Sequence, residues 1–346
     1  MSAALASASE ADLAQLLSQA ETLHSGIGGN SALLTVDGTP VFVKKIPLTD
    51  LEREVEHFMA TSNLFKLPTF FQYGVGSAGF GAWRELVAHK MTTDWVLSDQ
   101  CPNFPLMYYW CVLPTNQAAP MNEEELAALN AAVKYWAGDR GVRQRLEAIH
   151  NASANLVLFL EYVPQNLYQW LAEQLKAGDS AAQRATAFVQ ENIQATITFI
   201  SSRSFLHFDA HFQNLLTDGE IVYFSDFGLA LSSAFDLTLT ERAFLETHRN
   251  YDRCSSIVYL FHCLITNWIV NEGGAGEDKW QTGLRRYLNG EAGELTQLAH
   301  WDAATVQQYA AIALLMSEFY DNLQQATDST PYPAVELERL LTAIDR

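Results

Sequence analysis

Basic residues are scarce in this chain of 346 residues. It has 21 Lys and Arg against 40 Asp and Glu, which gives a formal net charge of −19. Binding to a phosphate backbone depends on clustered Lys and Arg side chains. We therefore expect neither nucleic acid nor an anionic membrane as a partner. A negative surface is compatible with a cationic substrate, although it also serves solubility alone.

Cysteine is rare, and no hydrophobic run is long. The four cysteines are Cys101, Cys111, Cys254 and Cys263. They show no CxxC or zinc-ligand spacing, so we expect ordinary buried thiols in a reducing cytoplasm. The most apolar run, residues 257–270, is too short to cross a bilayer and is predicted to be a buried helix. The N-terminus lacks a basic region followed by an apolar one, so no secretory signal is expected.

The first 90 residues are predicted to form mainly strands. Residues 33–36 and 41–44 flank Asp37-Gly38, a pair typical of a two-residue hairpin turn. Residues 50–62 are then predicted to form a helix with apolar side chains at helical spacing. Those side chains are Leu51, Val55 and Phe58.

The pattern changes from about residue 91 to 155, where aromatic residues and prolines precede an alanine-rich helix that Asn122 is predicted to cap. We interpret this stretch as an insertion that packs on the first domain. Residues 156–160 follow as a buried strand, and helical patterns dominate from residue 165 to the C-terminus.

One stretch contains groups suited to phosphoryl transfer. Residues 207–214, HFDAHFQN, fit the pattern HxDxxxxN, and Asp226-Phe-Gly follows after a second Asp-Gly hairpin at Asp218. Phosphoryl transfer needs a carboxylate near the attacking hydroxyl and oxygen ligands that hold Mg²⁺ against the triphosphate. Asp209, Asn214 and Asp226 can provide these groups. Taken singly, the same residues would be turn and cap residues.

This order of motifs closely resembles the protein-kinase superfamily. The resemblance covers roughly residues 20–90 and 155–270. It implies an α+β, bilobal fold with ATP and Mg²⁺ as cofactors. The small β-rich N-lobe would span residues 1–160 and the larger helical C-lobe residues 161–346. By the same resemblance Asp209 is the catalytic base, and the other two oxygen-bearing residues bind the metal.

The resemblance also assigns phosphate contacts in the first lobe. Residues 41–46, VFVKKI, resemble the strand that carries the phosphate-contacting lysine, which makes Lys44 that residue. The preceding glycine-rich stretch departs from GxGxxG, but its backbone N–H groups could approach phosphate oxygens. Its candidate residues are Gly26, Gly28, Gly29 and Ser31.

In this superfamily a helix glutamate orients the lysine. Glu54 lies where the resemblance places it, with Glu52 and Glu56 as rivals, because one sequence does not fix the helix phase. All three are otherwise ordinary surface carboxylates.

Residues 156–164, LVLFLEYVP, resemble the hinge that binds adenine. By analogy the backbone groups of Glu161 and Val163 would contact the base, and Leu160 would line the pocket. The alternative is a plain core strand.

Two features separate the chain from typical protein kinases. His211 stands two residues after Asp209, as in aminoglycoside phosphotransferases and choline-kinase-like enzymes, and no APE motif follows Asp226-Phe-Gly. We therefore expect a small-molecule kinase that phosphorylates a hydroxyl, compatible with an amine-bearing acceptor. An atypical protein or peptide kinase and a non-catalytic nucleotide-binding module remain the alternatives.

Overall fold

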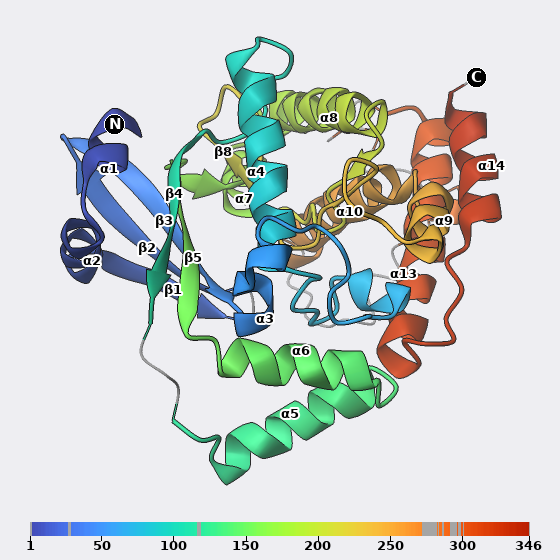
Figure 1. The fold of residues 1–346 in the computed structure, drawn as a ribbon. Coiled ribbons are helices and arrows are strands. Elements are labelled where there is room, and N and C mark those ends of the chain that lie inside the picture. The colour runs from blue at the N-terminus through green and yellow to red at the C-terminus, as the bar shows by residue number, and fades with distance from the viewer. Residues whose placement is uncertain are drawn as a thin grey trace. The chain divides into compact units, whose positions relative to one another are not determined.

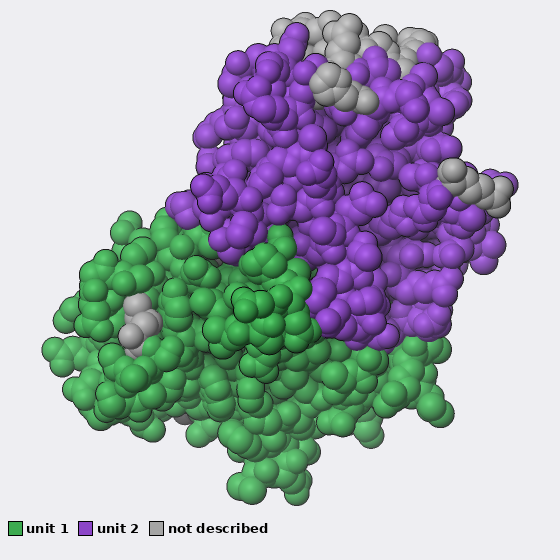
Figure 2. All heavy atoms as spheres, turned by 90° about the horizontal axis from the view of Figure 1, so that it is seen from above, with its two compact units in different colours: residues 1–163, 207–209, 226–244 green, residues 164–206, 210–225, 245–346 purple. Residues whose placement is uncertain are grey.

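The computed structural model describes most of the chain as two compact units, coloured separately in Figure 2. Unit 1 comprises residues 1–163, 207–209 and 226–244. Unit 2 comprises residues 164–206, 210–225 and 245–346. The residues outside the description are 1, 27–28, 116–118, 272–281, 283, 286, 291–295, 297–298, 300 and 346.

Unit 1 contains a five-stranded antiparallel sheet with the order β1-β2-β3-β5-β4 (Figure 1). Its strands are β1 (Glu21–Gly26), β2 (Gly29–Val36), β3 (Thr39–Leu48), β4 (Met107–Pro114) and β5 (Ala154–Glu161). The other elements of this unit are α1 (Ser2–Ser7), α2 (Glu10–Ser18), α3 (Asp50–Arg53), η1 (Val55–His57), η2 (Thr69–Gln72), α4 (Ala82–Leu97), α5 (Glu123–Tyr135), α6 (Arg140–His150) and β10 (Leu231–Ser232). The α+β class predicted from the sequence is therefore confirmed.

The first predicted hairpin is confirmed. β2 and β3 pair up to Val36 opposite Thr39, which leaves a two-residue turn. Asp37 and Gly38 both have positive φ, 52° and 79°. Two consecutive residues with positive φ match the right-handed twist of the flanking strands, which is why Asp-Gly is favoured there.

Side-chain alternation along β3 and β5 determines which residues meet which helices. Val41 and Val43 face a core that includes leucines of α1 and α2. Ile46, with the even-numbered leucines of β5, faces α4 on the other side (Figure 1). Lys44 has the parity of Ile46 and pairs with Leu158. Alternation therefore puts the Lys44 side chain on the α4 side of the sheet.

The helix predicted over residues 50–62 is wrong in length. α3 ends at Arg53, because Glu54 takes an extended backbone conformation (φ −56°, ψ 142°). Val55, predicted to be on the buried face, is 95% exposed. A capping box between Thr49 and Glu52 starts this helix, and the Glu52 side chain is buried. The helix ends one residue after Glu52, at Arg53.

The region predicted as an insertion, residues 91–155, contributes a strand to the sheet, because β4 pairs with β5. Its first residues complete α4, and its later part forms α5 and α6, which pack side by side (Figure 1). Asn122 caps α5 as predicted, in a capping box with Glu125. Side chains of residues 65–80 pack with Trp136 and Val142 in a separate apolar cluster. This cluster attaches α6 to the segment between β3 and α4.

Unit 2 is mostly helical. Its described elements are β6 (Gln165–Asn166), α7 (Leu167–Lys176), α8 (Asp179–Ser201), β7 (Phe205–Leu206), β8 (Leu215–Thr217), β9 (Val222–Phe224), α10 (Tyr251–Asn271), α13 (Ala303–Gln325) and α14 (Ala334–Ile344). α9 (Leu239–Thr247) begins in unit 1 and ends in unit 2. The second predicted hairpin is confirmed, since β8 and β9 pair across residues 218–221.

All four cysteines are free thiols; Cys101, Cys254 and Cys263 are buried as predicted, and Cys111 is only partly buried. Along the parts that the structure describes, we find no helix with both the length and the hydropathy to cross a membrane.

Candidate active site

Lys44 is the centre of an ion cluster in unit 1, in which Lys44 and Glu85 are buried and Asp226 is partly exposed. Its Nζ lies 2.7 Å from Oε1 of Glu85 and 2.8 Å from Oδ1 of Asp226. Glu85 comes from the first turn of α4, which packs on the face of the sheet that carries Lys44. Asp226 directly follows the β8–β9 hairpin. The structure thus brings together Lys44 and Asp226, two residues predicted from separate motifs.

The cluster sets the charge of each member. Burial alone would lower the pKa of Lys44, but the carboxylates of Asp226 and Glu85 raise it above its ordinary value. Burial opposes ionisation of Asp226, yet Lys44 and the backbone N–H of Gly228 lower its pKa to about 2. Burial raises the pKa of Glu85 to about 7 despite the nearby ammonium. Lys44 and Asp226 are therefore charged at neutral pH, and Glu85 titrates near it.

The partner of Lys44 is Glu85, so the prediction of Glu54 is corrected. Glu54 lies after the end of α3 with its side chain half exposed. Of its two rivals, Glu56 is also exposed, and Glu52 is buried but holds Arg145 through a 2.8 Å ion pair. The physical reason is the short α3: the helix that faces Lys44 is α4, which begins at Ala82.

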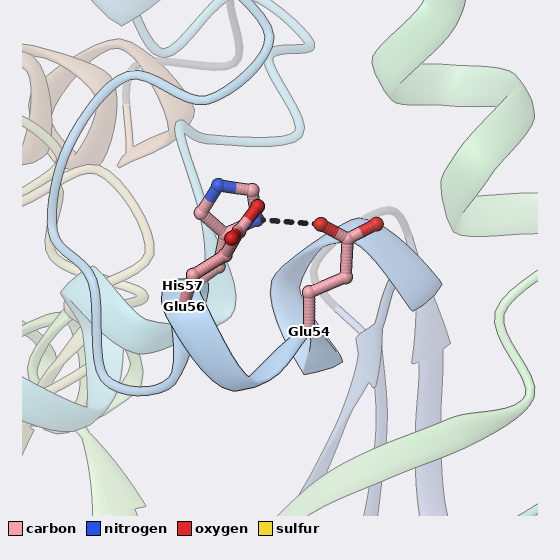
Figure 3. Close-up of side chains that lie close together, drawn as sticks. All are labelled: Glu54, Glu56 and His57. Carbon is pink, nitrogen blue, oxygen red and sulfur yellow. Dashed lines mark ion pairs between the residues drawn. The ribbon is translucent and has the colours of Figure 1, made fainter.

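Glu54, Glu56 and His57 form the one group of possible metal ligands found among the described residues (Figure 3). His57 Nδ1 lies 3.3 Å from Glu54 and 2.9 Å from the carbonyl oxygen of Leu51. A carbonyl oxygen only accepts hydrogen bonds, so that contact requires a proton on Nδ1. With the proton on Nδ1 directed to Leu51 and both carboxylates exposed, we interpret this group as a surface contact.

The main chain at Asp209 is fixed by the buried side chain of His207. The Asp209 N–H donates to Nδ1 of His207 at 3.3 Å, and the His207 ring is fully buried 5.2 Å from the ring of Phe227. Phe208 has a φ of 67°, a left-handed conformation that is unusual for a bulky residue. Asp226 also has a positive φ, 62°. Backbone strain of this kind is found at functional sites, and positive φ also occurs away from this site, as at Met59 and Ala137.

Asn214, the other predicted metal ligand, belongs to unit 2. Its backbone carbonyl accepts hydrogen bonds from the N–H and the hydroxyl of Ser225, at 3.2 and 2.6 Å. Ser225 immediately precedes Asp226 in the chain. The β8–β9 hairpin therefore fixes the main-chain entry to Asp226, as the order of motifs predicts.

A cavity of about 220 Å³ opens beside the ion cluster. Asp209, Asp226 and Glu85 line it, and Arg145 of α6 lines it as well. Much of the remaining wall is the glycine-rich segment of residues 74–81. A Cβ added at Gly74 would lie 2.7 Å from Oδ1 of Asp209, so this segment passes directly over the predicted base.

Residues in this segment and on either side of it also hold the chain after Asp226. Gln72 Nε2 donates to the carbonyl of Leu229 at 2.6 Å, and Arg84 pairs with Glu241 at 2.6 Å through two buried side chains. A Cβ added at Gly79 would collide with the backbone carbonyl of Gly228, and Gly79 has a φ of 67°. The backbone can come this close only where there is no side chain.

The predicted glycine loop is described in part. Gly26 ends β1 opposite Gly29, which begins β2, and Ser31 pairs with Lys44 across β2 and β3. Gly29 has a φ of 113°, and an added Cβ would collide with the carbonyl of Lys45. Gly28 lies outside the described residues.

The predicted hinge residues lie at the end of β5. Leu160 and Val163 are buried. The Glu161 N–H donates to the carbonyl of Leu106 at 2.8 Å, and its carboxylate accepts from the N–H of Leu106 at 3.0 Å. Glu161 therefore fixes the segment that leads into β4. These hydrogen bonds do not involve the backbone carbonyl of Glu161 or the N–H of Val163. Adenine contacts at those two groups therefore stay a prediction.

Sequence reasoning missed Glu85, Arg145 and the segment 74–81. Glu85 and His89 stand one turn apart on α4, a stretch of 16 residues that helical spacing could have detected. His89 is fully buried, packs its ring 4.8 Å from that of Phe227 and has its pKa lowered to about 3 by burial and by Lys44. Arg145 gave no signal, because α6 reaches the site only through tertiary packing.

The sequence was also compared with known proteins. It matches neither any of the protein-family models nor any of the curated proteins searched. A function has to be argued from the site itself.

Proposed function

We propose that the protein is an ATP-dependent phosphotransferase with a bilobal, protein-kinase-like fold that transfers the γ-phosphate to a hydroxyl of a small-molecule acceptor. One observation carries the proposal: Lys44 is held between Glu85 and Asp226, and the cavity beside them is lined by Asp209. A buried lysine kept charged by two carboxylates is suited to contact phosphate oxygens.

Asp226 fits a role as a Mg²⁺ ligand. Both hydrogen bonds that the described residues give this carboxylate, from Lys44 and from the Gly228 N–H, go to Oδ1. Oδ2 thus keeps its lone pairs, and Mg²⁺ prefers carboxylate oxygens. Asn214 would be the second protein ligand, as the motif resemblance implies. When bound, the ion would neutralise the charge of the transferred phosphoryl group.

Three residues of this chain have separate roles in the proposed phosphoryl transfer. Lys44 positions the phosphates, and Glu85 orients Lys44. Asp209 orients the acceptor hydroxyl and takes its proton as the acceptor oxygen bonds to the γ-phosphorus. The bond between that phosphorus and the β,γ-bridging oxygen breaks, so ADP leaves and the acceptor becomes a phosphate ester. Asp209 finally releases the proton to solvent.

The direct test is phosphoryl transfer from γ-labelled ATP in Mg²⁺, with metabolite pools and lysate proteins as acceptors. We expect a labelled small molecule with wild type, no label above background with Asp226→Ala, and weaker transfer with Lys44→Ala. Asp37→Asn is a matched control, because it removes a carboxylate from an exposed hairpin turn where Asn is well tolerated. Near-normal transfer by a folded Asp226→Ala protein would overturn the proposal.

A further inference from the structure

Arg145 lines the cavity but has no part in the chemistry described so far. Its side chain is 3% exposed, and Nη1 donates to Oε2 of Glu52 at 2.8 Å. Its Nε is buried and has no hydrogen-bond partner in the described part of the chain. Buried polar groups in native proteins are nearly always hydrogen-bonded, to protein or to water, so the guanidinium of Arg145 is a candidate donor to a group that enters the cavity.

The surroundings hold Arg145 in place and engage one of its donors, Nη1. The Glu52 carboxylate also accepts from the N–H and hydroxyl of Thr49, at 3.0 and 2.6 Å, and from the N–H of Ala82 at 2.7 Å. Four donors therefore share one carboxylate. A guanidinium has five N–H groups in a fixed fork, and Glu52 engages only one of its nitrogens.

A second feature of the cavity also favours a negative charge. α4 is 16 residues long, and its N-cap Gly81 provides no side-chain hydrogen bond, although the N–H of Ala82 donates to Glu52. Gly81 and Ala82 both line the cavity. The N-terminus of a helix carries a partial positive charge, which favours an anion close to it.

The position of this anion site relates it to the acceptor more than to the nucleotide. Of the residues predicted to contact the nucleotide, neither Lys44 nor the described glycine-loop and hinge residues line the cavity. Asp209, the predicted base, lines it together with Asp226, and the backbone at Gly74 lies directly against Asp209. A group held at Arg145 is thus in the same enclosed space as the side chain that would take the acceptor proton.

We propose that Arg145 and the N-terminus of α4 bind a carboxylate or phosphate group of the acceptor, whose hydroxyl lies at Asp209. The acceptor is then a small hydroxy acid or a phosphorylated alcohol. This inference rests on the phosphotransferase proposal. It differs from the amine-bearing acceptor with which the negative net charge of the chain is compatible.

Binding of two anionic probes tests the proposal directly. Glycerate and inorganic phosphate are titrated into the protein with and without a non-hydrolysable ATP analogue and Mg²⁺, and glycerol and serinol are the neutral and cationic counterparts of glycerate. We expect at least one anion to bind wild type in the presence of nucleotide, and Arg145→Gln to weaken that binding by about tenfold or more. Absence of anion binding at tens of millimolar, or equal binding by Arg145→Gln, would overturn it.

A second measurement identifies the source of the anion. Arg145→Gln should bind Mg²⁺-ATP within a few-fold of wild type. If the variant instead loses about tenfold or more for ATP but not for ADP, Arg145 serves the γ-phosphate and the acceptor proposal is wrong. Failure of wild type to bind any nucleotide rejects the phosphotransferase itself, a result distinct from failure of the anions. Preference for glycerol or serinol over glycerate in transfer assays also contradicts the proposal.

Three companion variants separate recognition from folding. Removing Arg145 alone leaves Glu52 as an uncompensated buried charge, so the double variant Glu52→Gln/Arg145→Gln removes both charges together. It should fold and still lack anion binding. Arg145→Lys keeps the positive charge but loses the planar set of guanidinium N–H donors, so it should bind anions weakly. Arg143→Gln makes the same substitution on a half-exposed side chain of α6 and should bind like wild type.

Discussion

At the scale of single residues, Asp209 and Asp226 are two carboxylates in one cavity with different surroundings. Asp226 is bound to Lys44 at 2.8 Å, and its pKa falls to about 2. Asp209 lies against the backbone of Gly74, and its own N–H is tied to His207. The carboxylate next to the lysine suits metal and phosphate, and the one under the glycine segment suits the acceptor.

Asp209→Asn should therefore separate binding from turnover. The substitution is nearly isosteric, and Lys44, Asp226 and the metal would keep their contacts with the nucleotide. We expect kcat to fall on the order of 10²-fold or more, as for loss of an acid–base group, with ATP affinity within a few-fold. Steady-state kinetics and calorimetry measure the two quantities. Wild-type turnover would show that Asp209 is not the base, and loss of ATP binding would give it a nucleotide or metal role.

Glu85 should make stability depend on pH near neutrality. Folding raises its pKa from 4.5 to about 7. A raised pKa contributes stability that is fully present below about pH 4.5 and is lost as pH rises through about 7. Between about pH 5 and about pH 8, the unfolding free energy of wild type should fall more than that of Glu85→Gln, by on the order of 1–3 kcal/mol.

Denaturant titrations at several pH values measure this difference. Glu54→Gln is the control, because it makes the same change on an exposed side chain. Its curve should run parallel to that of wild type. Parallel curves for Glu85→Gln as well would show that folding does not raise the pKa of Glu85.

Residues that belong to a local motif could be predicted, and residues that meet only through packing could not. Lys44 and Asp226 were predicted from a strand and a hairpin, and the ion pair between them follows from the fold. Glu85 lies on a helix separated from β3 by a long irregular segment. Arg145 comes from a helix that no local pattern connects to the site, so its position depends on contacts between distant parts of the chain.

At the scale of elements, turns and caps were more predictable than helix lengths. Asp37-Gly38 and Asn122 specify their turn and cap through their own backbone and side-chain chemistry. The helix predicted from residue 50 depended on apolar spacing alone, and Val55 is nevertheless exposed. There the burial of Glu52, with its Arg145 and Thr49 partners, overrides the periodicity.

α6 gives a prediction at this scale. Gly141 lies one turn before Arg145, and a Cβ added there would collide with the backbone carbonyl of Phe65. Gly→Ala in a helix ordinarily stabilises by roughly 0.5–1 kcal/mol. Gly141→Ala should instead destabilise by about 1–3 kcal/mol, because backbone has to move. Ala128→Gly on the exposed side of α5 measures the free-energy difference between Ala and Gly in a helix without packing contacts. A Gly141→Ala variant that is more stable than wild type would contradict the close contact with Phe65.

At the scale of the whole molecule, the chain passes between the two units several times. Residues 207–209 and 226–244 belong to unit 1, although the sequence suggested placing everything after residue 160 in a second lobe. Asp209 and Asp226 are therefore part of the same compact unit as Lys44. Neither unit is one continuous segment, so ligand binding has to be tested on the full chain.

Binding of Mg²⁺-ATP should raise the thermal midpoint of the full chain. A ligand that binds only the folded state stabilises it by RT ln(1 + [L]/Kd), about 2.7 kcal/mol at 100 times Kd. The shift should grow with ligand concentration and shrink when Mg²⁺ is chelated, since Asp226 would then hold no metal against the phosphates. Asp226→Ala should show a smaller shift, and Asp37→Asn the full one. A wild-type midpoint that does not move at millimolar Mg²⁺-ATP, with no heat of binding by calorimetry, would contradict a nucleotide site at Lys44.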